Sequence, residues 1–368
     1  MLISDVNAIG GFFIKYNRLF ELNQIFKFSK WKECSNLDIY IDMNSATKEL
    51  FYSRPPINKE EEIASTILNL CGHYRNYYRR HYQCETRFFV IYSVNRPKTC
   101  SSFFEEYNSR NVMEQVSNPA IYNMILKACS YLEALCKYIP DVFFIYSDYE
   151  TYVSIFDSIE YRQNVAWPSL ILSKDAMTYQ ILPFSERAIL ARPKKSYKYK
   201  NINNEDAKVS YDDSVFLTAA DVFPTVSKYV LKCGYKPIWG QVSPSLLSLV
   251  YALRGLDKRS IPMLLNTDET FQTILDGITF GNIQNVYNPN INSLYDALRL
   301  SKFGVAKKDI HDRFMALDLL TQHSMMQSEL SLKVDEYNNA IINLHDPDKV
   351  KYANSTTFAN CPILLDNL

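Results

Sequence analysis

The sequence predicts an α/β protein with a mostly parallel central sheet and a helical C-terminal part. Short apolar runs alternate with longer segments of helical periodicity, which is the pattern of a parallel sheet with helices on both faces. The chain has 368 residues, of which 47% are hydrophobic and 22% charged, as in an ordinary globular protein with one large core or two domains. After about residue 183 a polar segment appears, and the pattern then becomes mainly helical.

Four short apolar runs in the first half read as strands buried on both faces. They cover residues 37–41, 87–92, 142–146 and 170–172. A long helix over Glu60–Tyr82 joins the first two, because its apolar residues recur at helical spacing. Further helices are expected around 128–136, over 149–159 and from 176 to 180.

Five segments follow from this pattern. They are an N-terminal lead-in (1–35), an α/β domain (36–190), a polar loop (191–213), a helical part (214–330) and a C-terminal tail (331–368). The helical part is expected to hold helices over 244–255, 268–277, 291–300 and 310–326.

Composition excludes several classes of function. The formal net charge is zero, so any nucleic-acid contact must come from local basic patches. The eight cysteines lack a CxxC pair or zinc spacing, which indicates reduced, mostly buried thiols. No P-loop, dinucleotide-binding or zinc-protease motif occurs. Without a signal peptide or a membrane-spanning run, the sequence predicts a soluble cytoplasmic protein that makes no membrane contact.

Acidic side chains follow three of the predicted strands. Asp42 comes after the first, Asp148 and Glu150 after the third, and Asp175 after the fourth. The carboxyl ends of parallel strands meet at one edge of a sheet, so these acids should share a crevice. Clustered carboxylates need a cation, hard oxygen ligands suit Mg²⁺, and two such ions can hydrolyse a phosphodiester. Asp175 alone has an equally good second interpretation as the cap of the helix that follows it.

Over residues 36–330 the sequence resembles the 5′-3′ exonuclease and flap endonuclease family of PIN-like nucleases, and the motifs occur in the order of that family. Degenerate forms of the family motifs stand at 39–45, 88–93, 103–110, 148–153, 172–180 and 252–262. The resemblance implies a PIN-like (5′ nuclease) domain, with Asp42, Glu150 and Asp175 as remnants of the catalytic, metal-binding acids. It also implies that 103–110 matches the segment that contacts the scissile strand, and that 252–262 opens a degenerate helix-hairpin-helix region.

Several family acids are absent from the matching positions. The replacements are Ser93, Tyr152, Val153, Met177, Leu256 and Arg259. Three acids are too few for two ions, and Arg259 would bring a positive charge to the place of the second ion. The sequence therefore predicts weak Mg²⁺ binding or none, and a catalytically disabled protein. The alternative is a divergent Mg²⁺-dependent 5′ nuclease with further ligands such as Asp148 or Asp257.

Two groups of cations are candidates for binding DNA or RNA. Lys98 and Arg110 lie in or near the segment that resembles the strand-contacting motif, and the tyrosine-interleaved run at 192–200 contains Arg192, Lys194, Lys195 and Lys198. A charged loop is the plain alternative for this run. Residues 75–82 also mix cations with aromatics, but a solvated basic face over buried tyrosines explains them more simply.

The sequence thus predicts a degenerate 5′-nuclease-like protein that acts as a nucleic-acid-associated or structural subunit of a larger complex. Its 27 tyrosines and 21 phenylalanines suit protein interfaces, so a pure interaction module is a further alternative. Abundant Asn, Ile, Lys and Tyr favour an AT-rich genome, hence a phage or viral source. In that case the protein would reside in the host cytoplasm or within a viral assembly.

Overall fold

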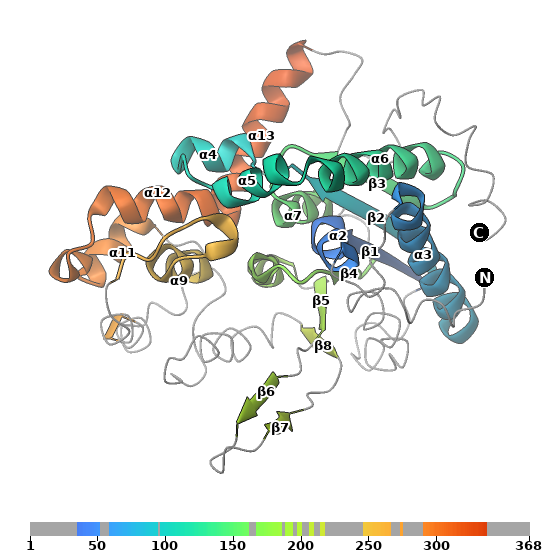
Figure 1. Ribbon diagram of the computed structural model, residues 1–368, viewed down its shortest axis with the longest axis horizontal. Helices are drawn as coiled ribbons and strands as arrows, with labels where there is room; N and C mark the ends of the chain where they lie inside the picture. The colour runs from blue at the N-terminus through green and yellow to red at the C-terminus, as the bar shows by residue number, and fades with distance from the viewer. Residues whose placement is uncertain are drawn as a thin grey trace.

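A six-stranded sheet lies at the centre of the α/β part (Figure 1). The computed structural model describes residues 35–51, 59–94, 96–161, 167–185, 188–193, 197–200, 206–209, 214–217, 246–265, 273–274 and 290–336. The strand order is β3-β2-β1-β4-β5-β8, parallel except for β8. The strands are β1 (Asn36–Asp42), β2 (Glu85–Ser93), β3 (Val142–Ser147), β4 (Ser169–Leu172), β5 (Ala188–Pro193) and β8 (Ser214–Leu217).

Helices account for most of the remaining described chain. They are α2 (Met43–Phe51), α3 (Glu60–Tyr82), α4 (Lys98–Phe103), α5 (Ser109–Ser117), α6 (Pro119–Cys136), α7 (Thr151–Tyr161), α9 (Leu247–Arg254), α11 (Ile291–Ala297), α12 (Lys307–Leu317) and α13 (Leu319–Glu336). Three 3₁₀ helices add to them: η4 (Ala176–Phe184), η7 (Asp257–Arg259) and η9 (Leu300–Phe303). Among the described helices, none has the length and apolar character that a membrane span requires.

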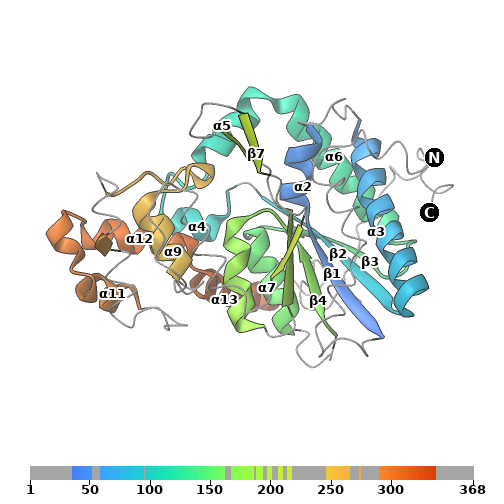
Figure 2. The ribbon, with the colours of Figure 1, turned by 90° about the horizontal axis from the view of Figure 1, so that it is seen from below.

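Strand β1 is central because its apolar residues face both layers of the core. Ile39 and Ile41 pack with α2, α3 and α6 on one face, whereas Tyr40 stacks on Phe89 in the core of the other face. In register, Asp42 lies opposite Ile91 of β2, and Ile41 opposite Leu172 of β4. The carboxyl ends of these parallel strands therefore meet at one edge, as the sequence predicts (Figure 2).

Helix α3 has the bounds that its periodicity predicts. Its C-terminal cap is Gln83, which adopts a left-handed conformation with φ of 52°. Tyr74 and Tyr78 are fully buried, while Arg79 and Arg80 are exposed. The mixture of cations and aromatics at 75–82 is thus a solvated basic face over buried tyrosines.

The helical C-terminal part is joined to the other face of the sheet through a buried glutamine. Gln180 Nε2 donates to the Leu317 carbonyl at 3.2 Å, and its Oε1 accepts from Leu319 N at 3.1 Å and Ser248 Oγ at 2.9 Å. Tyr152 donates to the same Leu317 carbonyl at 2.9 Å. One side chain from η4 therefore fixes α9 and the junction of α12 and α13 against the α/β layer.

The prediction of a polar loop over 191–213 is wrong for the residues that are described there. β5 extends to Pro193, and β6 (Tyr197–Lys200) pairs antiparallel with β7 (Asp206–Val209) as a separate two-stranded ribbon. The charged composition obscured a strand signal, since the Tyr-Lys-Tyr-Lys run of β6 has both a period of two and a β-favouring residue.

The boundaries of the helical part also need correction. Residues 214–217 form strand β8, which extends the sheet edge beyond β5. The single helix expected over 310–326 is two, because Asp318 ends α12 and accepts from Thr321 N at 3.0 Å and Thr321 Oγ1 at 2.8 Å, capping α13. Helix α13 continues to Glu336, into the expected tail. The lead-in to residue 34, most of 268–277 and the tail from 337 lie outside the described residues.

Candidate functional site

The structure brings Asp42, Glu150 and Asp175 together at the carboxyl edge of the sheet. Asp42 ends β1, Glu150 immediately precedes α7, and Asp175 caps η4 by accepting a hydrogen bond from Met177 N at 3.1 Å. The cap that the sequence left open for Asp175 is therefore present. Each strand positions its acid by ending at the same edge.

Asp42 is buried and held by two serine hydroxyls. Its Oδ2 accepts from Ser45 Oγ at 2.5 Å and from Ser173 Oγ at 2.6 Å, and its Oδ1 accepts from Ser45 N at 3.0 Å. Burial raises the pKa of Asp42 above its ordinary value, and the nearby Asp175 adds to this effect, while the serine hydrogen bonds oppose it.

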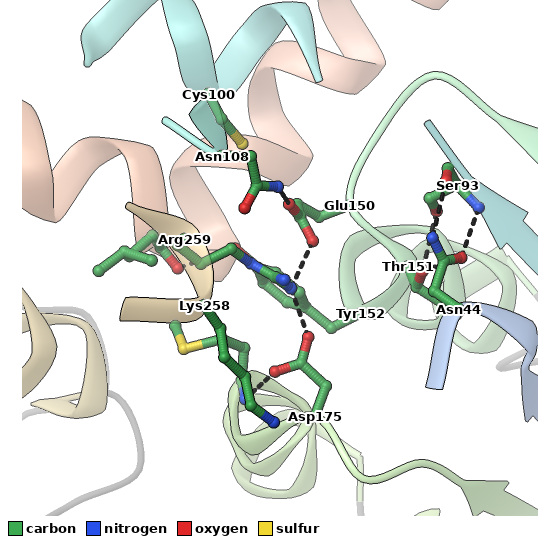
Figure 3. Close-up of polar contacts among 12 residues, drawn as sticks. Asn44, Ser93, Cys100, Asn108, Glu150, Thr151, Tyr152, Asp175, Lys258 and Arg259 are labelled. Atoms are coloured by element: carbon green, nitrogen blue, oxygen red, sulfur yellow. Dashed lines mark hydrogen bonds and ion pairs between the residues drawn. The ribbon is translucent and has the colours of Figure 1, made fainter. Parts of the chain in front are cut away.

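The guanidinium of Arg259 lies between Glu150 and Asp175 (Figure 3). Its Nη2 is 2.7 Å from Glu150 Oε2 and 2.5 Å from Asp175 Oδ2. Burial raises the pKa of Glu150, and Arg259 counteracts part of that rise. Burial would lower the pKa of Arg259, but the two carboxylates outweigh it, so that this pKa is well above its ordinary value. Arg259 is therefore a cation held inside the crevice.

Tyr107 and Asn108 complete the surroundings of Glu150. Tyr107 is fully buried and donates its hydroxyl to Glu150 Oε1 at 2.8 Å, and Asn108 Nδ2 lies 3.4 Å from the same oxygen. Both oxygens of Glu150 are thus hydrogen-bonded within the protein.

A compact loop over residues 255–261 presents Arg259. Leu256 and Ile261 form a two-residue bridge, with Leu256 N to Ile261 O at 2.8 Å and the reverse bond at 3.2 Å. Gly255 opens the loop with φ of +85°, and a Cβ at this residue would lie 2.8 Å from Met263 N. Only glycine satisfies both constraints, so the loop geometry depends on it.

The same loop is bonded to the N-terminus of α5. Asn108 N donates to Arg259 O at 2.8 Å, and Arg110 N donates to Ser260 Oγ at 2.9 Å. Asn108 and Ser260 both have left-handed backbones, with φ of 56° and 58°. The left-handed residues thus lie on both sides of this junction, and the two hydrogen bonds help to hold the loop against α5.

A neutral network occupies the neighbouring part of the crevice, beside β2. Asn44 bonds the Ser93 backbone in both directions at 2.8 Å, and Thr151 Oγ1 donates to Asn44 Oδ1 at 3.1 Å and lies 3.0 Å from Ser93 Oγ. Ser93 stands where the resemblance implies an acid. These polar groups satisfy one another without any charge.

A divalent ion does not fit this arrangement. Among the described residues, no three His, Cys, Asp or Glu side chains are grouped to hold a metal ion. Arg259 fills the space between Glu150 and Asp175 and carries the positive charge. Asp148 and Asp257, considered as additional ligands, are both exposed.

The candidate nucleic-acid residues occupy two places. Lys98 begins α4 and Arg110 lies in the first turn of α5; both are exposed. Arg192 is on β5 and Lys198 on β6, while Lys194 and Lys195 lie outside the described residues. Arg110 is adjacent to the crevice, because its backbone bonds the loop that carries Arg259.

Solved structures show which fold this is. The 5′-exonuclease of bacteriophage T5, in a structure with bound zinc, matches with a TM-score of 0.51 over 84% of this chain and 100% of that one, at 11% identity. The chain has the fold of a 5′ nuclease. A T5 flap endonuclease complex with DNA and metal ions also matches, at 11% identity and a TM-score of 0.49 over 84% of this chain and 99% of that one.

Comparisons of the sequence itself found no relatives. No protein-family model matches the chain, and no curated protein matches it either. At 11% identity the structural likeness establishes the 5′-nuclease fold alone.

Sequence reasoning missed several residues that shape the site. Tyr107 and Asn108 lie within a segment expected to face a nucleic-acid strand, yet they bond Glu150. Nothing in the sequence distinguishes Tyr107 from an ordinary core tyrosine. Asn44 had a usable signal, since a polar residue two places after the Asp42 that ends a buried strand must find partners at the sheet edge.

Proposed function

We propose that this chain is a 5′-nuclease fold without nuclease activity, which serves as a nucleic-acid-associated or structural subunit of a larger complex. The observation that carries the proposal is the pairing of Arg259 with both Glu150 and Asp175. In a metal-dependent nuclease such carboxylates must be free to bind ions that activate water and stabilise the leaving oxygen. Here one oxygen of each carboxylate is bonded to an internal cation, the Arg259 guanidinium.

The neutral network beside β2 supports the same conclusion. Two ions require more anionic oxygen ligands than one, and Asn44, Ser93 and Thr151 supply none. Their hydrogen bonds to one another also hold these side chains in place. Recovering activity would therefore require new acids as well as removal of Arg259.

The cations beside the crevice support retention of nucleic-acid binding. Lys98 and Arg110 are exposed on helices next to the strand-end edge, where they can contact phosphates without any ion. The T5 flap endonuclease with this fold has been solved with DNA. The formal net charge of zero predicts weak, sequence-independent and strongly salt-dependent binding.

Cleavage and binding assays test the two halves of the proposal. With Mg²⁺ or Mn²⁺, 5′-flap and 5′-ended DNA should remain uncut. Fluorescence anisotropy should detect binding at low salt, and Lys98→Gln/Arg110→Gln should flatten the salt slope on duplex DNA by up to about 2, at roughly 0.9 per phosphate contact. The control is Lys302→Gln/Lys308→Gln, which removes the same charge from exposed sites on η9 and α12.

Two results would overturn the proposal. Robust cleavage that disappears in Asp175→Ala would establish a divergent metal-dependent nuclease. Failure to bind single-stranded or double-stranded DNA and RNA at low salt would leave a pure protein-interaction module.

A further inference from the structure

The contact that Arg259 makes is unusual for an arginine. A single nitrogen, Nη2, contacts an oxygen of each carboxylate, at 2.7 Å and 2.5 Å. Arginine ordinarily binds carboxylates through two parallel N–H···O bonds of its planar fork. Arg259 Nε is buried and has no hydrogen-bond partner in the described structure. The guanidinium thus acts through one atom, as a point-like cation would.

We propose that Arg259 is a built-in replacement for a divalent cation, and that removing it turns the same carboxylates into a site for Mn²⁺ or Mg²⁺. The inference rests on the proposed function in one respect only, namely that the natural chain holds no catalytic ion.

Charge balance requires a cation at this position. The side chains of Glu150 and Asp175 are 6% and 20% exposed, and both contact the same nitrogen. Two ionised carboxylates so close together in a low-dielectric site repel each other strongly unless a positive charge lies between them. Arg259, itself 13% exposed, is the cation that the structure supplies there. A divalent ion held by Glu150 and Asp175 would supply the same compensation.

The space between the carboxylates should persist when the guanidinium is removed. The loop over 255–261 is held by its own Leu256–Ile261 bridge and by backbone contacts from Asn108 and Arg110, none of which uses the Arg259 side chain. Glu150 remains fixed by Tyr107, and Asp175 by its cap on Met177 N. Loss of the side chain therefore leaves two acids that are still anchored by contacts that do not involve Arg259.

The test compares Arg259→Gln with the natural chain in the presence of divalent ions. Both proteins are freed of metal with EDTA, and their melting temperatures are recorded by calorimetry with and without millimolar MnCl₂ or MgCl₂. The natural chain should not respond to either ion. Arg259→Gln should melt several degrees lower without metal and recover most of that loss with MnCl₂. Electron paramagnetic resonance of free Mn²⁺ should show about one ion taken up per variant chain and none by the natural chain.

Two further variants isolate the charge. Arg259→Lys keeps a cation and should take up no Mn²⁺. Arg259→Gln/Asp175→Asn removes one positive and one negative charge while asparagine keeps the cap. It should recover stability without metal and lose the response to MnCl₂. If Arg259→Gln fails to fold without metal, folding with MnCl₂ alone supports the proposal, and failure in both conditions overturns it.

An unchanged melting temperature in Arg259→Gln without metal, or the absence of Mn²⁺ uptake by that variant, would refute the replacement. Equal Mn²⁺ uptake by the natural chain would refute it as well. None of these measurements involves nucleic acid. The inference and the proposed binding function can therefore fail separately.

Discussion

The crevice at the carboxyl edge of the sheet has two halves, and its polar side chains are compensated differently in each. In the charged half, Glu150 and Asp175 are compensated by Arg259, which lies more than eighty positions away in the sequence from either of them. In the neutral half, Asn44, Ser93 and Thr151 satisfy one another beside the ends of β1 and β2 and the start of α7. One half depends on a distant charge, and the other depends on uncharged hydrogen bonds.

This difference shows which half of the crevice depends on a positive charge. Two ionised carboxylates that contact the same atom repel each other unless a cation lies between them, and in the charged half Arg259 supplies that cation. The neutral half demands none. A single substitution at Arg259 therefore leaves the first half short of a positive charge, whereas the second half contains no charge to unbalance. The two halves should consequently respond differently to mutation, pH and metal.

Breaking the charged half should have the largest effect. Arg259→Met removes the cation that contacts both Glu150 and Asp175, and removing one partner of a buried ion pair costs about 3–5 kcal/mol of unfolding free energy. The loss, measured by urea unfolding at pH 7.5 without metal, should shrink at lower pH as the freed carboxyls take up protons. The exposed Lys308→Met on α12 serves as the control, and an equal loss in both variants would contradict this account.

Breaking the neutral half should have a smaller and pH-independent effect. Asn44→Ala removes both partners of the Ser93 backbone groups and the acceptor of Thr151. Unsatisfied buried polar groups cost about 1–3 kcal/mol. The same urea measurements should give this loss with little change between pH 5 and pH 8. A loss that varies with pH as much as that of Arg259→Met would show that the two halves are not independent.

Asp42 should give the stability of the fold a pH dependence of its own. Burial raises the pKa of Asp42 above the ordinary 3.8, so the folded chain holds this proton more tightly than the unfolded chain does. Protonation of Asp42 therefore adds stability that is fully present below pH 3.8 and is lost as the pH rises through the raised pKa. Asp42→Asn should remove this contribution, making the fall in unfolding free energy across that window shallower. An unchanged pH profile would argue against a buried, titrating Asp42.

The smallest effect is expected at an exposed ion pair far from the crevice. Arg79 and Glu85 form two hydrogen bonds at 3.0 Å and 2.6 Å, but both side chains are more than half exposed. Solvent and salt screen such pairs, so Arg79→Gln should leave the unfolding free energy unchanged within error. A loss approaching that of Arg259→Met would mean that burial is not what separates the two ion pairs.

The sequence by itself determined the α/β layer and its ordered strand ends. Apolar runs such as those of β1 and β3 admit few alternatives to buried parallel strands, and α3 follows directly from its spacing. It also determined that Asp42, Glu150 and Asp175 would meet, because each follows a strand or begins the next helix at one edge of the sheet. Local pattern is sufficient where every residue of an element obeys the same period.

The tertiary structure alone decided what those acids do. Whether Glu150 and Asp175 face solvent or an internal cation depends on the path of residues 255–261, which Gly255 and contacts with α5 set across long sequence separations. Likewise, the break between α12 and α13 depends on the cap that Asp318 forms. Strands β6, β7 and β8 depend on pairing with a partner strand. Side-chain identity limits which partners are chemically possible, and packing selects among them.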